Sequence, residues 1–290
     1  MKEYVDLRTS SDRGDGMGHG THVAGTIAGK TNDGKIIGIA PDATLMSSSV
    51  FDGSKTTMSA IIRGMQWSVE NGADIINMSL GAFDRSRWLG NYDAAQAELG
   101  WAHDAYNNAI SNANRAGCLV VAAIGNDGAG STKTPGSCLG SLAVGAMSKD
   151  GRCAGFSGGA VLVYHKDGSY SSNYIKPDVS APGVNIKSSD RFGQYTTASG
   201  TSMATPCVSG VAALVLSSSD YLGQLADPYH KAVLLKYVLK YSASNDLGEF
   251  GSDTRYGQGV VNAQDAVKLG RDNVRMDSIY TRLMNAGMFD

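Results

Sequence analysis

The sequence has no large excess of charge of either sign. Its 25 lysines and arginines nearly balance 27 aspartates and glutamates, which gives a formal net charge of −2 and a pI of about 6.2. Proteins that bind nucleic acid or an anionic membrane surface by electrostatic attraction carry an excess or a cluster of positive charge. We therefore expect neither kind of partner.

Long hydrophobic runs and a targeting segment are also missing. The first 30 residues contain no apolar core of a signal peptide, and no stretch is expected to be long enough to cross a bilayer. A secreted protein would have this sequence only after removal of its targeting segment. With 42% hydrophobic and 18% charged residues, the chain is typical of a globular protein rather than a disordered one.

Cysteine is scarce, and its spacing matches no zinc-ligand pattern. The four cysteines are Cys118, Cys138, Cys153 and Cys207. One or two disulfides and four buried thiols are both compatible with this spacing. The cysteines therefore do not identify the compartment in which the protein works.

Strand-like and helix-like segments alternate along the chain and predict an α/β fold. Apolar strand patterns occupy Leu45–Phe51, Asp74–Met78, Leu119–Ile124 and Leu142–Ala146, and helical patterns occupy Ser59–Glu70, Tyr92–Ala116, Met203–Ser217, Lys231–Tyr241 and Ala263–Lys268. Strands that alternate with helices, without a hairpin signal, favour a mostly parallel central sheet with helices on both faces. Because repeats and low-complexity linkers are missing, residues 1–290 are expected to form one domain.

The first segment that could carry chemistry is Gly18-His19-Gly20-Thr21-His22. Two histidines three residues apart could lie on one helical face and hold a metal. The metalloprotease pattern would require a glutamate where this chain has Gly20. From the residues alone, a structural or metal-binding role is the more frequent explanation of such a pair.

The second segment, Gly200–Pro206, places Ser202 just before an apolar helix. A serine at that position is most often only an N-cap. A helix N-terminus also favours negative charge, so the backbone N–H of Ser202 could help to stabilise an oxyanion. Pro206 is expected in the first turn of this helix, where no intrahelical donor is lost.

The third segment, Gly125-Asn126-Asp127-Gly128, directly follows the predicted strand Leu119–Ile124. A turn is the more frequent explanation for such residues. The carboxyl end of a parallel strand is also where ligands bind in open α/β sheets, and the Asn126 amide could donate to an oxyanion there.

Together these segments resemble the histidine, oxyanion-asparagine and serine blocks of the subtilisin-like serine proteases (subtilases, peptidase S8), in the family's chain order. The resemblance covers about Gly14 to Val267, and Lys2–Met17 is most similar to the secreted, proteinase-K-like branch. Further similar segments are Gly38–Ala43, Asn77–Gly81, Lys176–Gly183 and Tyr256–Ala263.

The resemblance implies an extracellular serine endopeptidase that hydrolyses polypeptides through an acyl-enzyme and needs no cofactor. His19, rather than His22, would be the general base for the nucleophile Ser202, and Asn126 with the Ser202 N–H would form the oxyanion hole. The residues expected to contact an extended peptide substrate are Ser79, Leu80, Gly81, Ser54, Lys55 and Thr56, with Gly125 as one wall of the pocket for the residue before the scissile bond.

The chain departs from the family at the triad aspartate. Subtilases carry this residue in Asp-Ser/Thr-Gly, at the end of an apolar strand some tens of residues before the histidine, but only 18 residues precede His19. Asp6 is the strongest local candidate, ahead of Asp12 and Asp15, although Leu7-Arg8 follows it. We therefore expect an N-terminally incomplete domain without one central strand, for which the missing segment or a propeptide would be a partner. Without that strand, the backbone groups of its two neighbours would be unpaired.

Two smaller departures concern single residues. Cys207 stands where the family usually has histidine, and Asn32 lies where relatives often place a calcium-ligating asparagine. The usual partner carboxylate comes from a segment that is missing here, so calcium is only weakly supported and no other metal is expected. Residues Ala82–Gly117 are more numerous than usual and are expected to extend a surface helix.

Two other functions remain open. A pseudoprotease would keep the peptide groove but turn over little substrate, and it differs from a peptidase in having no carboxylate within hydrogen-bond reach of His19. An α/β-hydrolase esterase is suggested by Gly200-x-Ser202-x-Ala204, which faintly resembles a nucleophile elbow. That class requires its histidine after the serine, and His230, the only later histidine, lacks the family's context.

Overall fold

A four-stranded parallel sheet forms the centre of the fold. The computed structural model describes residues 3–7, 15–31, 34–84, 94–166, 170–245 and 252–289. The sheet consists of β3 (Ile75–Met78), β5 (Leu119–Ala123), β7 (Leu142–Met147) and β10 (Val179–Pro182), in the order β10-β7-β5-β3. The parallel arrangement predicted from the alternating pattern is confirmed.

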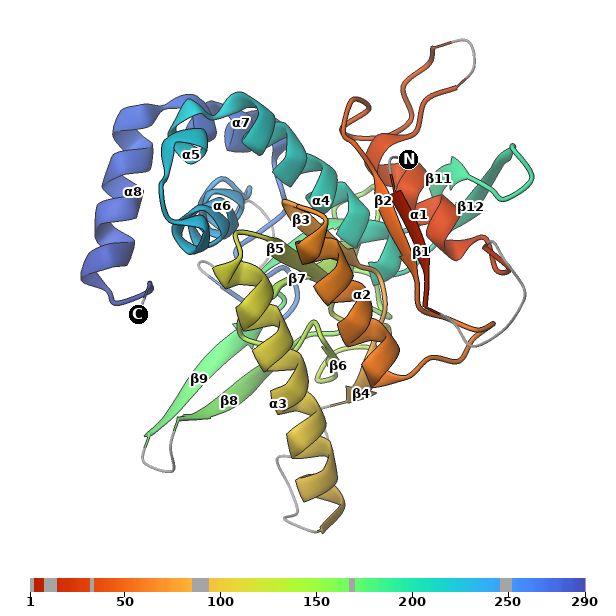
Figure 1. Cartoon of the computed structure of the whole chain (residues 1–290), viewed down its shortest axis with the longest axis horizontal. Helices are drawn as coiled ribbons and strands as arrows, with labels where there is room; N and C mark the ends of the chain where they lie inside the picture. The colour runs from red at the N-terminus through yellow and green to blue at the C-terminus, as the bar shows by residue number, and fades with distance from the viewer. Residues whose placement is uncertain are drawn as a thin grey trace.

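Helices cover both faces of this sheet, which makes three layers. Every residue of β5 is buried, and alternate side chains of a strand point to opposite faces. Accordingly, Leu119 and Val121 belong to one hydrophobic cluster, and Val120 and Ala122 belong to another. The first cluster includes residues of α4 (Thr201–Ser218), α6 (Pro228–Tyr241) and α7 (Ala263–Arg271), whereas the second includes residues of α2 (Met58–Glu70) and α3 (Ala94–Arg115) (Figure 1).

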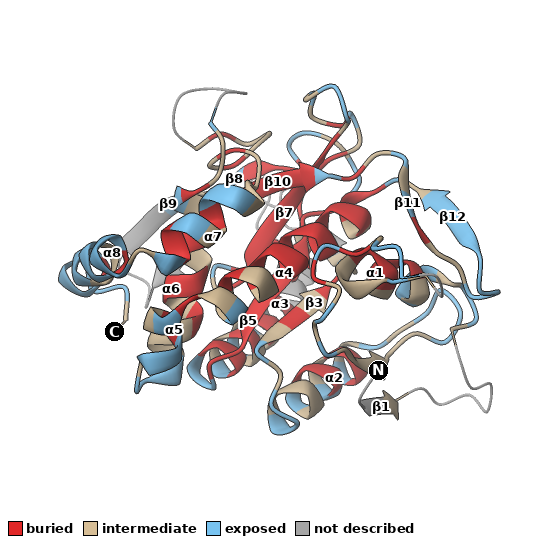
Figure 2. Cartoon of the chain, turned by 90° about the horizontal axis from the view of Figure 1, so that it is seen from above, coloured by how far each residue is buried: buried red, intermediate tan, exposed pale blue. Residues whose placement is uncertain are grey.

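Helix α4 lies at the centre of the molecule. By length and composition alone, this helix of 18 residues could cross a membrane, so the expectation that no stretch reaches that length was wrong. However, 67% of it is buried inside the fold (Figure 2), as in the core helix of a globular domain. Its apolar residues are explained by packing against the sheet and α7.

The parallel strands are divided into two separate sheets. β1 (Glu3–Asp6) pairs with β2 (Met46–Ser49) in parallel, with Asp6 opposite Ser49. Among the described residues β2 has no other strand partner, and β3 is bonded only to β5. β2 and β3 are consecutive parallel-sheet strands joined by α2, yet they lie in different sheets (Figure 1). Among the described residues, no strand joins β2 to β3.

Three antiparallel pairs were not predicted, and the expectation of no hairpin was wrong. They are β4 (Ala82–Asp84) with β6 (Lys133–Thr134), β8 (Ala160–Lys166) with β9 (Tyr170–Lys176), and β11 (Ile186–Ser189) with β12 (Tyr195–Ala198). β8 and β9 project from the body of the molecule (Figure 1). The sequence contains Asp167-Gly168, a dipeptide that favours hairpin turns.

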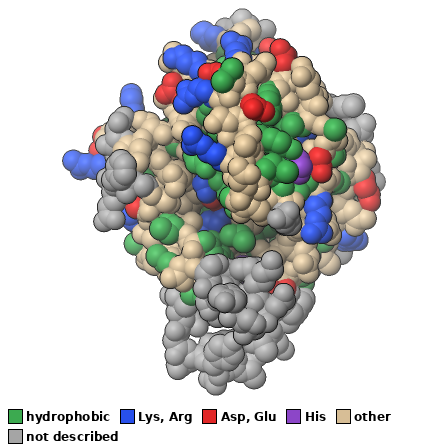
Figure 3. Space-filling model, turned by 90° about the vertical axis from the view of Figure 1, so that its left-hand side faces the viewer, with side chains coloured by type: hydrophobic (Ala, Val, Ile, Leu, Met, Phe, Trp, Pro, Cys, Tyr) green, Lys and Arg blue, Asp and Glu red, His purple; other side chains and the backbone are tan. Residues whose placement is uncertain are grey.

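The remaining helices are α1 (His19–Ala28), α5 (Asp220–Gln224) and α8 (Asn273–Asn285). The chain end after α8 is held by aromatic contacts, since the Phe289 ring lies 4.2 Å from the ring of His230 and 5.3 Å from that of Tyr280 between centroids. Figure 3 looks at this side of the molecule and shows hydrophobic side chains gathered on it.

All four cysteines are thiols and none forms a disulfide. Cys118, Cys138 and Cys207 are buried, and Cys153 is half-buried. Burial raises the pKa of Cys118 and of Cys207 to about 12, so these thiols are neutral and poor nucleophiles. Of the two possibilities that the spacing left open, the structure has thiols rather than disulfides.

Candidate active site

Ser202 is the second residue of α4, at the point where the helix begins beside the end of β3. The side chain is half-buried, and its hydroxyl donates a hydrogen bond to the carbonyl of Ser79 at 3.3 Å. The N-terminus of a helix leaves backbone N–H groups without intrahelical partners. A hydroxyl held there is therefore next to donors that can stabilise a developing negative charge.

Pro206 lies in the second turn of α4 rather than the first, because the helix begins at Thr201 and not at Met203. Proline has no N–H, so it cannot bond to the carbonyl four residues earlier, which belongs to Ser202. The hydroxyl of Ser79 donates to that carbonyl instead, at 2.8 Å. Ser79 in turn accepts from the amide of Asn77 at 3.0 Å. Ser79 thus replaces the helical hydrogen bond that proline removes and attaches the Ser202 backbone to the end of β3.

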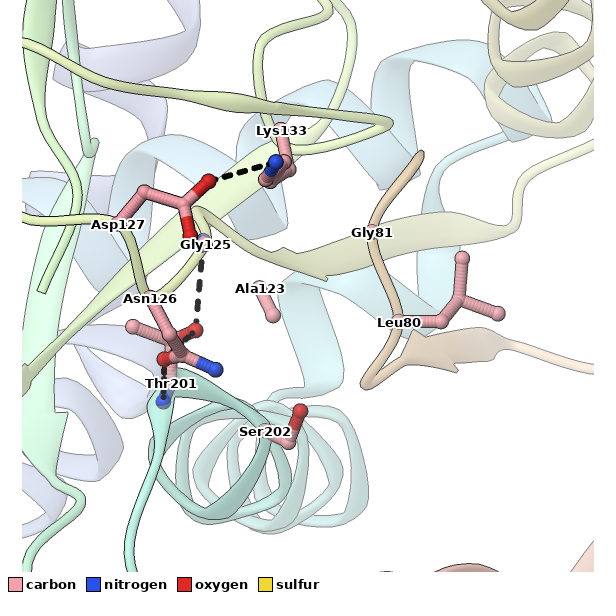
Figure 4. A pocket seen from close by; sticks show the side chains of 9 residues that line it. All are labelled: Leu80, Gly81, Ala123, Gly125, Asn126, Asp127, Lys133, Thr201 and Ser202. Carbon is pink, nitrogen blue, oxygen red and sulfur yellow. Dashed lines mark hydrogen bonds and ion pairs between the residues drawn. The ribbon is translucent and has the colours of Figure 1, made fainter. Parts of the chain in front are cut away.

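The Asn126 side chain is oriented by Thr201. Its Oδ1 accepts hydrogen bonds from the backbone N–H and the hydroxyl of Thr201, both at 2.9 Å, which leaves the amide nitrogen to donate elsewhere. Figure 4 shows that nitrogen on the side of Asn126 that faces Ser202. A Cβ atom built on Gly200 would lie 3.6 Å from Asn126 Nδ2 and 3.7 Å from the Ser202 nitrogen. The two donors therefore border one small space, and such an arrangement can hold an oxyanion.

A pocket of about 150 Å³ opens beside Ser202. Of the residues selected from the sequence, five line it: Leu80, Gly81, Gly125, Asn126 and Ser202 (Figure 4). Neither His19 nor the segment Ser54–Thr56 belongs to its walls. Ser54 and Lys55 are exposed in a tight turn before α2, and the Thr56 hydroxyl donates to the Val50 carbonyl at 2.6 Å.

His19 is the first residue of α1 and is exposed. Within the described part of the chain, its imidazole makes no hydrogen bond, either to Ser202 or to a carboxylate. Desolvation by the surrounding protein lowers the pKa of His19, although the charge of Asp15 opposes this effect. The imidazole is therefore more readily neutral, and able to accept a proton, than an unperturbed histidine.

Asp15 is the carboxylate whose charge acts on His19, but its oxygens are bonded to the helix. They accept from the backbone N–H of Gly18 at 2.9 Å and from the N–H and hydroxyl of Thr21 at 2.6 and 2.8 Å. Burial by itself raises the pKa of Asp15, but these hydrogen bonds outweigh it and hold the pKa below its usual value. Asp15 therefore binds the backbone at the N-terminal end of α1, where Gly18 is the N-cap, and affects His19 only through space.

The other residues selected near the N-terminus have structural positions. His22 is buried, and its Nε2 lies 2.9 Å from the Ile186 carbonyl, which fits the interpretation of a packing residue. Asp6 belongs to β1, which pairs only with β2 among the described residues. Asp12 and Asn32 lie outside the described residues. The described part of the chain contains no group of three or more histidine, cysteine, aspartate or glutamate side chains that could hold a metal ion.

Two charged residues of the pocket were not selected from the sequence. Lys133 and Asp127 both line it, and Lys133 Nζ lies 2.6 Å from Asp127 Oδ2. Asp127 stood inside the segment Gly125–Gly128 but was interpreted only as part of a turn. No sequence pattern indicated that Lys133 lies in the pocket, because its strand β6 is two residues long and the partner strand β4 was not predicted.

The chain matches known proteins along most of its length. The subtilase family model matches residues 1–259. Subtilisin Savinase of Lederbergia lenta is 36% identical over 255 residues, which are 88% of this chain and 79% of that protein. An alkaline protease of Alkalihalobacillus alcalophilus is also 36% identical over 255 residues, which are 56% of its length. The chain thus spans little more than half of some relatives.

Solved structures agree with this assignment. The prenylagaramide maturation protease PagA has 33% identity and a TM-score of 0.68, with 92% of this chain and 86% of that chain covered. The protease domain of PatA, solved as an S218A mutant, has 29% identity and a TM-score of 0.68, with coverage of 92% and 94%. The fold, the order of the site segments and these similarities lead to one conclusion: the chain belongs to the subtilase family of subtilisin-like serine endopeptidases.

Proposed function

We propose that this chain hydrolyses peptide bonds with Ser202 as the nucleophile, His19 as the general base, and Asn126 with the Ser202 N–H as the oxyanion hole. The observation that carries the proposal is the pair of donors beside the Ser202 hydroxyl. Thr201 holds the Asn126 oxygen and so turns its amide nitrogen toward Ser202. Removing one such donor typically lowers the rate by a factor of about 10²–10³.

In this mechanism His19 takes the hydroxyl proton of Ser202 as the oxygen attacks the substrate carbonyl, and later gives it to the leaving amine. The lowered pKa of His19 keeps the imidazole neutral, as a base must be, at neutral pH. Ser202 and His19 are not hydrogen-bonded in the free protein. Catalytic hydrogen bonds are often long or incomplete before the substrate binds.

The groove is proposed to bind an extended peptide. Residues Ser79–Gly81, after β3, offer backbone groups next to Ser202, and an added peptide strand would bond to them. Ser54–Thr56 is proposed as the opposite side of the groove. The structural similarity to PagA, a maturation protease, favours limited cleavage of a precursor peptide over general digestion. An extracellular location, a propeptide partner and a calcium ion remain proposals based on the family resemblance.

The alternative function is a peptide-binding pseudoprotease with little turnover. It is favoured by one specific observation: no carboxylate among the described residues is hydrogen-bonded to His19, because the oxygens of Asp15 are bonded to α1. Both functions share the same groove. They differ in whether Ser202 is chemically activated.

A fluorophosphonate probe, located by intact mass and peptide mapping, distinguishes the two functions. We expect the probe to label Ser202, to fail on Ser202→Ala, and to react much more slowly with His19→Ala. Ser217→Ala is the matched control, since Ser217 is exposed near the other end of the same helix and should not affect labelling. Labelling that survives Ser202→Ala would remove Ser202 from the mechanism, and no labelling of the wild type would favour the pseudoprotease.

A further inference from the structure

The side chain of Lys133 lines the pocket and lies between two glycines, Gly81 and Gly125. A Cβ atom built on Gly81 would lie 2.7 Å from Lys133 Cβ, and one on Gly125 would lie 2.6 Å from Lys133 Cγ. Side chains at either position would collide with the lysine stem. The backbone of Lys133 is held as well, because its N–H donates to the Ile124 carbonyl at 2.7 Å and β6 pairs with β4. The stem is therefore fixed by both walls of the pocket.

The ammonium group of Lys133 has only one anionic partner among the described residues. Its Nζ lies 2.6 Å from Asp127 Oδ2, and the two side chains are 29% and 49% exposed. Figure 4 shows this ion pair at the end of the pocket away from Ser202. An ion pair with this much solvent contact contributes little to stability. A carboxylate that enters the pocket can therefore take the place of Asp127 at small cost.

We propose that Lys133 determines specificity and selects an acidic side chain, glutamate or aspartate, in the substrate residue before the scissile bond. This inference rests on the proposed function and names the substrate class of the same site. A bound substrate excludes water from the pocket, so a substrate carboxylate and Lys133 Nζ would form a charge-assisted hydrogen bond in a medium of lower dielectric constant.

The relative exposure of the two partners favours an acidic rather than a basic side chain. Asp127 is the more exposed partner and can turn toward solvent when a substrate carboxylate arrives. Lys133 cannot turn away as freely, because Gly81 and Gly125 enclose its stem. A basic side chain would therefore meet an ammonium group that stays in the pocket. An apolar side chain would cover the ion pair without replacing its contacts with water.

Peptidyl phosphonates that differ only in the side chain before the phosphorus test the proposal. Probes with glutamate, glutamine and lysine side chains are compared by their second-order rates of labelling Ser202. For the wild type we expect glutamate to react about tenfold faster than glutamine, and lysine to react more slowly than glutamine. Lys133→Met should bring the glutamate-to-glutamine ratio to about one. Asp127→Asn should raise that ratio above the wild-type value, because it removes the competing carboxylate.

A fluorophosphonate without any side chain separates failure of this proposal from failure of the proposed function. Each rate is divided by the rate of that simple probe with the same variant. Lys149→Met, which removes an exposed lysine, controls for the loss of one positive charge. If Ser202 reacts with the simple probe but the ratio is one in the wild type, or survives in Lys133→Met, Lys133 does not select the substrate. If the simple probe also fails, the proposed function has failed and this inference fails with it.

Discussion

Supplying an apolar strand that ends in Asp-Ser/Thr-Gly should raise the peptidase activity of this chain by roughly 10⁴. In a serine–histidine–aspartate triad, the aspartate holds the imidazole in the correct tautomer and stabilises the imidazolium, and its change to the amide lowers kcat by about that factor. No described carboxylate is hydrogen-bonded to His19, so this chain alone is expected to be at most a very weak peptidase. The comparison is of kcat/KM with and without the segment, fused to the chain or added as a peptide.

The same segment should also stabilise the fold. β2 and β3 each have one strand partner among the described residues and lie in separate sheets, so a strand between them would pair on both sides. Paired backbone groups replace groups that would otherwise be unsatisfied when buried. Thermal unfolding should therefore occur at a higher temperature when the segment is present.

A segment with asparagine in place of its aspartate is the matched control. It should raise the unfolding temperature as much as the original segment does but leave kcat/KM near that of the chain alone. If instead the chain alone turns over peptides at about 1–10³ s⁻¹, the usual range for enzymes, a local carboxylate completes the triad. Asp15→Asn is then the first variant to measure, ahead of Asp6→Asn, because the charge of Asp15 acts on His19 whereas Asp6 lies in β1.

Asp178→Asn should lower the free energy of unfolding by about 3–5 kcal/mol, the cost typical of removing one partner from a buried ion pair. Asp178 is buried and accepts from Lys176 Nζ at 2.6 Å and from Lys240 Nζ at 3.0 Å. Lys176 is also buried, so the substitution would leave its ammonium group without a counter-charge. Chemical denaturation measures the change. If the slope of the unfolding free energy against denaturant concentration is the same in both proteins, the unfolded state is unaffected.

The exposed pair of Lys30 and Asp42 provides the control for this variant. Asp42 is 92% exposed, so Asp42→Asn should change the free energy of unfolding by less than about 0.5 kcal/mol. Equal effects of Asp178→Asn and Asp42→Asn would show that the buried pair does not stabilise the fold.

The pH dependence of stability gives a second check on Asp178. Burial alone raises the pKa of Asp178, but the nearby ammonium groups outweigh it and hold the pKa well below 3.8. The contribution of Asp178 is therefore complete at neutral pH and is lost only as the pH falls below about 3.8, where the unfolded carboxyl binds a proton first.

The central sheet could be predicted because burial on both faces leaves continuous apolar strands. β5 and β7 are such strands, and their predicted bounds differ from the observed ones by one residue at one end. The first residue of α4 was harder to predict from the sequence, because Thr201 and Ser202 are polar and do not continue the apolar pattern of the helix. Pro206 was consequently predicted in the first turn of the helix, whereas it lies in the second.

The antiparallel pairs and the charged end of the pocket could not be predicted from local pattern. β4 and β6 have three and two residues, too few to show an alternation, and they meet only in the folded chain. The position of Lys133, and with it the ion pair to Asp127, depends on the pairing of β4 with β6. The segments that contain Ser202, Asn126 and Leu80 were selected because together they resemble the subtilase blocks in the family's chain order, whereas local pattern alone favoured an N-cap for Ser202 and a turn for Asn126.

The structure of the protein after reaction with a fluorophosphonate tests the central claim most directly. We expect the phosphorus to be bonded to Ser202 Oγ, with one phosphonyl oxygen within hydrogen-bond distance of both Asn126 Nδ2 and the Ser202 backbone nitrogen, and the His19 imidazole next to Ser202 Oγ. A phosphonyl group bonded to another residue, or one whose oxygens face solvent with Asn126 still unbonded, would contradict the assignment of Ser202 and Asn126.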